Sequence, residues 1–250
     1  MKEPVARQFG EVFTGLPLFD DFYLRMQAMN LDILDGFIES QEKELLREYI
    51  DIERTPVSQA LFVSALSQLW IFGMYELLRT WRQRVEEILK FAAIFKSTPA
   101  ARRRALVQEK RKKVRELGKH ALGSPWPAFS KAVKSIRYVE KLQFAYDQSE
   151  LAFRRIEALR VSLAKHEIPK NKGAAALAPG YGRIDMTSGS IHWQIVLEEN
   201  EVDIVSRKTI AEECRAFPFM SSKLFLPRSV RSQLAGFPRH SYGTKRVRQP

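Results

Sequence analysis

The sequence predicts a mostly α protein: a helical bundle of about four long helices, followed by a small three-stranded antiparallel β meander with one short helix. Two observations carry this prediction. Apolar residues recur at the three- and four-residue spacing of a helix across residues 18–170. The spacing then changes to alternation, which places Ile191, Trp193 and Ile195 on one face of a strand. A chain of 250 residues is long enough for this bundle and a small appendage.

The same patterns divide the chain into five segments. Residues 1–17 lack periodicity, so we expect a flexible N-terminus, and residues 18–170 form the helical bundle. Residues 171–180 contain four alanines, two glycines and a proline, which is the composition of a linker. Residues 181–218 form the β meander and its helix, and residues 219–250 form a basic, disordered tail.

Start signals separate the long helices. The first helix runs from Phe19 to Ile52, and Thr-Pro pairs precede the next two, because threonine can cap a helix and proline is tolerated at its first position. The second helix, from Pro56 to about Phe95, is apolar nearly all round in its first half. This composition predicts the centre of the bundle and a candidate dimer interface. The third helix covers about residues 100–119.

The fourth long pattern covers residues 128–166, with a candidate interruption at residues 147–149, and Pro169 ends it. After the strands, Ser206 can cap the short helix, and Val205 and Ile210 have the spacing of a hydrophobic staple.

Thr55–Tyr75 is uncharged and mostly apolar, as a membrane span would be. Serines and glutamines dilute the stretch, and a buried bundle helix has the same composition, so we expect a bundle helix and no membrane partner. The single cysteine, Cys214, excludes an internal disulfide and a cysteine-based zinc site. It fits a reducing compartment, and residues 1–7 lack the apolar core of a signal peptide. We therefore expect a cytoplasmic protein.

Positive charge is concentrated in two places. The net charge is +12, and Lys96–Lys119 holds ten Lys and Arg residues against two Glu, while Ser222–Pro250 holds seven and no acid. Local positive charge of this kind is expected where a protein binds phosphate groups, although a solvated helix face has the same composition. The candidate nucleic-acid-binding residues are Arg102, Arg103, Arg104, Lys110, Arg111, Lys112, Lys113 and Arg115.

Several kinds of site are missing from the sequence. It has no glycine-rich phosphate loop, no His-x-x-x-His and no Cys-x-x-Cys pair, so we expect neither a cofactor nor a metal. Two pairs with chemical capacity remain, Arg160 with His166 and Arg115 with His120. The first pair is the better candidate because it closes the last long helix, whereas Arg115 belongs to the basic run.

The Arg-x5-His spacing of Arg160 and His166 resembles the motif of the HEPN family, all-α domains that often act as metal-independent ribonucleases. Val161 departs from the polar residue that usually follows the arginine. The resemblance implies RNA cleavage by the ribose 2′-hydroxyl in a cleft between two subunits. His166 would act as general acid or base and Arg160 would stabilise the phosphoryl charge. The alternative is that Arg160 pairs with a neighbouring glutamate and His166 caps the helix.

Helix geometry limits this pair. Six residues turn an ideal helix through about 600°, so the two side chains point about 120° apart. A shared phosphate therefore requires a turning helix end near Pro169, or a second subunit. The leading prediction is an RNA-acting, HEPN-like protein, most concretely a metal-independent endoribonuclease of toxin or defence type. RNA is the expected partner ahead of DNA, together with a second copy of the chain. The alternative is a non-catalytic nucleic-acid-binding or oligomeric assembly protein.

Overall fold

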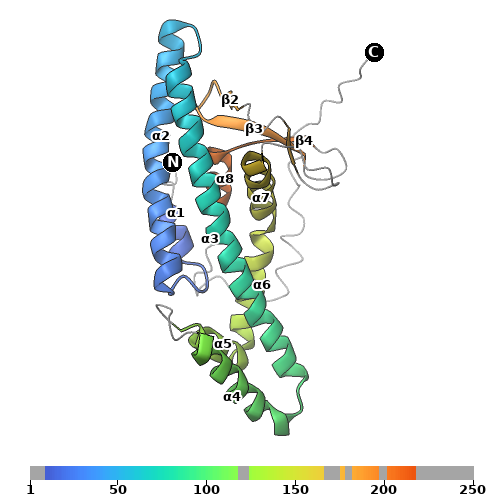
Figure 1. Ribbon diagram of the computed structural model, residues 1–250. Coiled ribbons are helices and arrows are strands. Elements are labelled where there is room, and N and C mark those ends of the chain that lie inside the picture. The colour runs from blue at the N-terminus through green and yellow to red at the C-terminus, as the bar shows by residue number, and fades with distance from the viewer. Residues whose placement is uncertain (1–8, 118–123, 166–174, 178–181, 197–201, 218–250) are drawn as a thin grey trace, which may run out of the picture. The chain divides into compact units, whose positions relative to one another are not determined.

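A computed structural model describes residues 9–117, 124–165, 175–177, 182–196 and 202–217. It confirms a mostly helical fold with a small antiparallel sheet and a short helix near the C-terminal end (Figure 1). The elements in chain order are α1 (Phe9–Thr14), α2 (Phe22–Ile52), α3 (Val57–Ser97), α4 (Ala100–Leu117), α5 (Trp126–Lys134), α6 (Ile136–Gln148), α7 (Glu150–Lys165), β1 (Ala175–Leu177), β2 (Arg183–Ile184), β3 (Ile191–Val196), β4 (Val202–Ser206) and α8 (Arg207–Arg215).

The long helices α2 and α3 run side by side, and α6 and α7 follow the other side of α3 (Figure 1). Asp21 starts α2, because its Oδ1 accepts hydrogen bonds from the backbone N–H groups of Tyr23 and Leu24. The indole Nε1 of Trp70 donates to the carbonyl oxygen of Leu31 at 3.2 Å. A Cβ atom at Gly73 would lie 3.0 Å from the Leu31 side chain, so glycine allows the two helices to approach closely here.

Only one side of α3 is buried. Its core side chains are fully enclosed and include Trp70, Met74 and Trp81. In contrast, Leu61, Phe62 and Leu69 are exposed, although the apolar composition of this half predicted the centre of the bundle and a candidate dimer interface. Among the described helices, α3 has the length and apolarity of a membrane span, and 44% of its most apolar stretch is buried.

The fourth predicted helix consists of three shorter ones. Ser149 separates α6 from α7, in agreement with the predicted interruption at residues 147–149. A second break lies at Ser135, whose backbone is extended and whose hydroxyl accepts from the backbone N–H of Tyr138 at 3.2 Å. Ser135 was not predicted as a break, because the apolar spacing continues across it.

Two boundaries differ from the prediction. Residues 1–17 were expected to be flexible, yet α1 is a helix, and Val12 and Phe13 are buried in the core. The linker predicted at residues 171–180 contains β1, which pairs with β3. The predicted tail at residues 219–250 lies outside the described residues.

β3 is the central strand of the antiparallel sheet. β4 pairs along one edge of β3, while β1 and β2 pair with successive parts of the other edge. Ile191, Trp193 and Ile195 alternate toward the core, as the sequence predicted. Ser206 ends β4 and caps α8, because its hydroxyl accepts from the backbone N–H of Thr209 at 3.0 Å. This cap turns the chain so that α8 packs against the helices.

Candidate nucleic-acid interface

The basic helix α4 has one anchored side. Leu106 and Val107 pack against the core and Val114 is buried. Arg103 donates to the carbonyl oxygens of Thr98 at 2.9 Å and Lys96 at 3.2 Å, so it satisfies carbonyl groups at the C-terminal end of α3. Lys110 lies over the ring of Phe129 at 4.3 Å. Arg103 and Lys110, two of the eight predicted nucleic-acid-binding residues, therefore contact the neighbouring elements on the anchored side of α4.

The other six cations of α4, Arg102, Arg104, Arg111, Lys112, Lys113 and Arg115, are exposed. At about 100° per residue, Arg104, Arg111 and Arg115 fall within about 40° of one another on one side of the helix. We call these three residues the arginine row. Arg102 and Lys113 lie on the opposite side with the acidic residues of α4, and Lys113 pairs with Glu109 at 2.8 Å.

The arginine row is not neutralised by the described part of the chain, because no carboxylate there forms an ion pair with any of its three members. Successive members are separated by about 10 Å and about 6 Å along the helix axis. The Arg111 guanidinium also lies 5.8 Å from the ring centroid of Trp126, which is half-buried at the start of α5. Within the described residues, the row thus presents three cations without an ion-pair partner, and one of them, Arg111, lies beside an aromatic ring.

The predicted catalytic residues are only partly described. Arg160 is half-buried on α7, and its guanidinium lies 4.9 Å from the ring centroid of Tyr75 in α3. Tyr75 also stacks on Phe153, and its hydroxyl donates to Glu157 at 3.5 Å. Burial, reinforced by the charge of Glu157, raises the pKa of Tyr75, so this phenol stays protonated at neutral pH. His166 and His120 lie outside the described residues.

A surface cleft of about 390 Å³ lies beside Tyr75. Its charged lining is balanced, since Arg79, Arg82 and Arg154 face Glu86, Glu150 and Glu157. Arg82 is buried and fully engaged: it donates to the Tyr146 carbonyl at 2.9 Å and to Ser149 at 2.6 Å, and it pairs with Glu150. The balanced charge and the engaged arginine make this cleft a weaker phosphate site than the arginine row.

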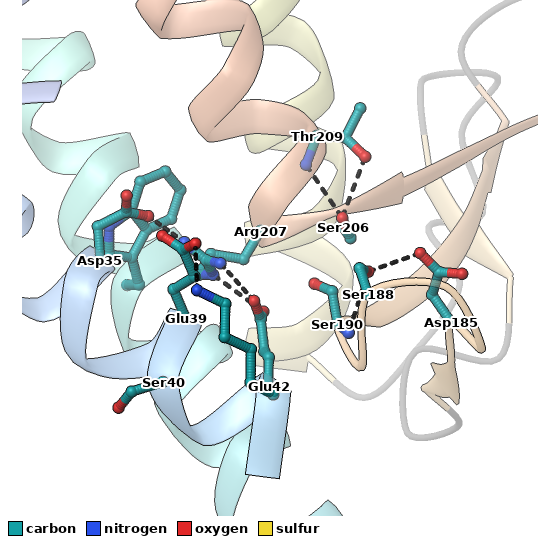
Figure 2. A network of polar contacts seen from close by, with 12 residues as sticks. Asp35, Glu39, Ser40, Glu42, Asp185, Ser188, Ser190, Ser206, Arg207 and Thr209 are labelled. Carbon is teal, nitrogen blue, oxygen red and sulfur yellow. Dashed lines mark hydrogen bonds and ion pairs between the residues drawn. The ribbon is translucent and has the colours of Figure 1, made fainter. Parts of the chain in front are cut away.

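Sequence reasoning missed a buried cluster that joins α8 to α2 (Figure 2). Arg207 donates to Glu42 through Nε at 3.1 Å and through Nη2 at 2.6 Å, and it also pairs with Asp35. Arg215 pairs with the second oxygen of Asp35. Two carboxylates and two guanidinium groups leave the cluster neutral. A signal was present, because Asp35 and Glu42 occupy apolar-face positions of α2 that hydrophobic residues otherwise fill.

Burial raises the pKa of Asp35, and the guanidinium groups of Arg207 and Arg215 oppose that shift. The cluster holds the sheet and α8 against α2, which is a structural role. Among the described residues, no group of His, Cys, Asp and Glu side chains has the arrangement of a metal site. No family model, curated protein or solved structure matches this chain.

Proposed function

We propose that this protein binds single-stranded nucleic acid, with RNA as the expected polymer, through the arginine row of α4 and the neighbouring ring of Trp126. The observation that supports this proposal is a row of three exposed arginines that form no ion pair within the described residues, with Arg111 beside an aromatic ring. Guanidinium groups pair with backbone phosphates, and an aromatic ring stacks on a base of any sequence. We therefore expect binding that depends steeply on salt and weakly on sequence.

The test is fluorescence anisotropy with a labelled oligouridine RNA, measured on the full chain at several salt concentrations. Arg104→Glu/Arg111→Glu/Arg115→Glu should weaken binding at least about tenfold. It should also reduce the slope of log K against log salt by about 2, since each phosphate contact on a single strand contributes about 0.7. The charge-matched control is Lys43→Glu/Arg47→Glu/Lys90→Glu, which reverses three exposed cations outside α4.

The two triple variants have the same net charge, so only the position of the reversed charges differs. Equal weakening in both would show that overall charge, and not the arginine row, determines affinity. Trp126→Ala should weaken binding about 5- to 100-fold through lost stacking, while Trp126→Phe should retain most of the affinity. If neither the arginine-row variant nor Trp126→Ala lost RNA affinity, the proposal would be overturned.

A finer candidate function is metal-independent RNA cleavage with Arg160 and His166. The observation in its favour is the contact of Arg160 with Tyr75, which fixes a partly exposed guanidinium on α7. In this proposal Arg160 stabilises the charge that develops on the phosphoryl group, and His166 transfers a proton to or from the 2′-hydroxyl. The balanced charge of the neighbouring cleft argues against a strong phosphate site there.

Cleavage is measured with labelled RNA in the presence of EDTA. Arg160→Ala and His166→Ala should each abolish cleavage, whereas His192→Ala, the matched control on β3, should retain it. Full activity in the His166 variant, or no cleavage by the unmodified protein, would remove the enzyme from consideration. Neither result would affect the binding proposal, because binding is measured separately.

A further inference from the structure

The helices α2 and α3 expose a large apolar surface. On α2 its residues are Met26, Met29, Ile33 and Phe37, and on α3 they are Val57, Leu61, Phe62 and Leu69. We call these eight side chains the outer face. The α2 members recur every three or four residues and lie opposite the buried Leu24, Leu31 and Ile38, so they point away from the core. α2 therefore has apolar stripes on two opposite sides, and the described part of the chain covers only one of them.

The two stripes lie on the same side of the helix pair. Two hydrogen bonds fix how α2 and α3 are aligned along their length: Gln59 donates to Gln41, and Trp70 donates to Leu31. This alignment places Ile33 beside Leu69. On α2, Asp35 faces α8, and on α3 the buried Trp70 faces the core. Both stripes occupy the side opposite these contacts, so they form one continuous surface.

The outer face is large enough for a stable association. Its side chains are between 40% and 73% exposed. Phe37 and Phe62 are aromatic side chains that can each bury about 150–250 Å², and the six aliphatic members are smaller, so each half-exposed member offers on the order of 100 Å² and the face on the order of 800 Å². This area exceeds the largest apolar patch of a typical monomer and equals the share of one partner in a standard interface.

Charge distinguishes the possible occupants. Asp35 and Glu42 are buried in the neutral cluster, so α2 shows five acidic and three basic residues at its surface, a net charge of −2, which opposes contact with anionic lipid. The acids are concentrated in its C-terminal half, whereas Arg25 and Asp32 leave the exposed surface of residues 22–34 neutral. Two copies that cross antiparallel would bring neutral surfaces together and place Arg25 of each copy toward the acidic half of the other. The outer face is thus complementary to itself.

We propose that the outer face is the interface of a homodimer, in which α2 and α3 of one copy pack on α2 and α3 of a second copy. The two-fold axis of such a contact passes near the middle of the surface, beside Ile33 and Leu69. The proposal makes no use of α4, so it is independent of nucleic-acid binding.

The first test is sedimentation of the full chain at micromolar concentration. The unmodified protein should be a dimer, and Ile33→Asp/Leu69→Asp should be a monomer, with a dissociation constant at least about 100-fold higher, because two carboxylates per copy would be buried at the contact. The matched control is Ile136→Asp/Ile204→Asp, which changes two exposed isoleucines outside the outer face and should remain dimeric. Circular dichroism confirms that both variants keep their helices.

The second test uses disulfide cross-linking to locate the axis. Cys214 is fully buried, so an introduced thiol is the reactive one in the native chain. Ile33→Cys should form a covalent dimer under mild oxidation, and Ile136→Cys should not. A monomeric unmodified protein, a dimer that survives Ile33→Asp/Leu69→Asp, or a monomer that binds neutral phosphatidylcholine vesicles through Ile33 would each overturn the proposal.

The arginine-row variant tests whether dimer formation and RNA binding are independent of each other. It should remain dimeric, because its three positions are absent from the outer face. Loss of RNA binding with an intact dimer and loss of the dimer with intact RNA binding are therefore distinguishable outcomes.

Discussion

The arginines of α8 and the arginines of α4 have the same side chain and opposite surroundings. Arg207 is 1% exposed and donates to both oxygens of Glu42 and to Asp35. Arg104 and Arg115 on α4 are exposed, and no carboxylate of the described residues pairs with them. The α8 arginines complete a neutral cluster, whereas those of α4 leave charge available to a polyanion.

The two sets of arginines differ in which groups would lose a partner if the arginine side chain were removed. Without Arg207, two carboxylates would remain buried and poorly compensated, which is energetically costly. Without Arg104, the helix would lose one solvated charge and no internal contact. Arginine therefore contributes to stability in α8 and to binding in α4, and substitutions should separate these two roles.

The largest expected effect is on stability at α8. Arg207→Ala should lower the free energy of unfolding by about 3–5 kcal/mol, because it breaks a buried ion pair while Glu42 and Asp35 stay in place. Urea denaturation followed by circular dichroism measures the change. Arg104→Ala, the matched deletion of an exposed arginine, should change the free energy by less than about 0.5 kcal/mol.

The double variant Arg207→Met/Glu42→Leu should recover most of the loss, because it removes one charge of each sign and leaves Asp35 with Arg215. If the double variant is less stable than Arg207→Ala, the cluster does not act as a balanced unit. Equal losses for Arg207→Ala and Arg104→Ala would erase the distinction between the two helices.

The second effect is on binding. Single substitutions Arg104→Gln, Arg111→Gln and Arg115→Gln should each weaken RNA binding about three- to tenfold and lower the salt slope by about 0.7. Arg111→Gln should have the largest effect, since Arg111 also contacts Trp126. Anisotropy titrations check this order, and Lys113→Gln should have the smallest effect because Glu109 already pairs with it. A loss for Lys113→Gln equal to that for Arg111→Gln would contradict the assignment of the row.

The sequence predicts more about the contacts of α4 than about those of α8. The thin apolar stripe of α4 shows which side is anchored, so the direction of the arginine row follows from helix geometry. The contacts of Arg103 and Lys110 could not be predicted, because their partners lie on other helices. Asp35 and Glu42 mark α2 as unusual, but their partners Arg207 and Arg215 are more than 160 residues away. Side chains across such separations meet only in the folded chain.

Local signals succeeded at the start of α8 but not at the start of α3, where Thr55 was expected to cap and no side chain caps the helix. Ser206 caps α8 as predicted, because its hydroxyl and the backbone N–H that donates to it lie within three residues. The helix at Phe9–Thr14 was missed, because its order comes from burial of Val12 and Phe13 in the core and not from its own short periodicity. The apolar composition of α3 predicted a bundle centre and a candidate dimer interface, but composition does not show which side of the helix the rest of the chain covers.

Arg103 tests whether position in the basic helix or surroundings determines the role of an arginine. Arg103→Ala should lower the free energy of unfolding by about 1–2 kcal/mol, because the backbone carbonyls of Lys96 and Thr98 at the C-terminal end of α3 lose a charged donor. RNA affinity should change less than in any variant of the arginine row. The two measurements are urea denaturation and anisotropy on the same preparation. A binding loss without a stability loss would place Arg103 in the interface.

The smallest expected effect is a pH dependence at Arg215. Removing its guanidinium with Arg215→Ala takes away one of the two charges that lower the pKa of Asp35, so burial raises that pKa further above its ordinary value of 3.8. The folded carboxyl then holds a proton that the unfolded chain has released, so stability falls as pH rises through the interval between the two pKa values. The stability difference between Arg215→Ala and the unmodified protein should therefore shrink as the pH is lowered from neutral toward 3.8, the ordinary pKa of this carboxyl. Asp35→Asn in the Arg215→Ala background should remove this pH dependence, and a difference that widens on acidification would contradict a raised pKa at Asp35.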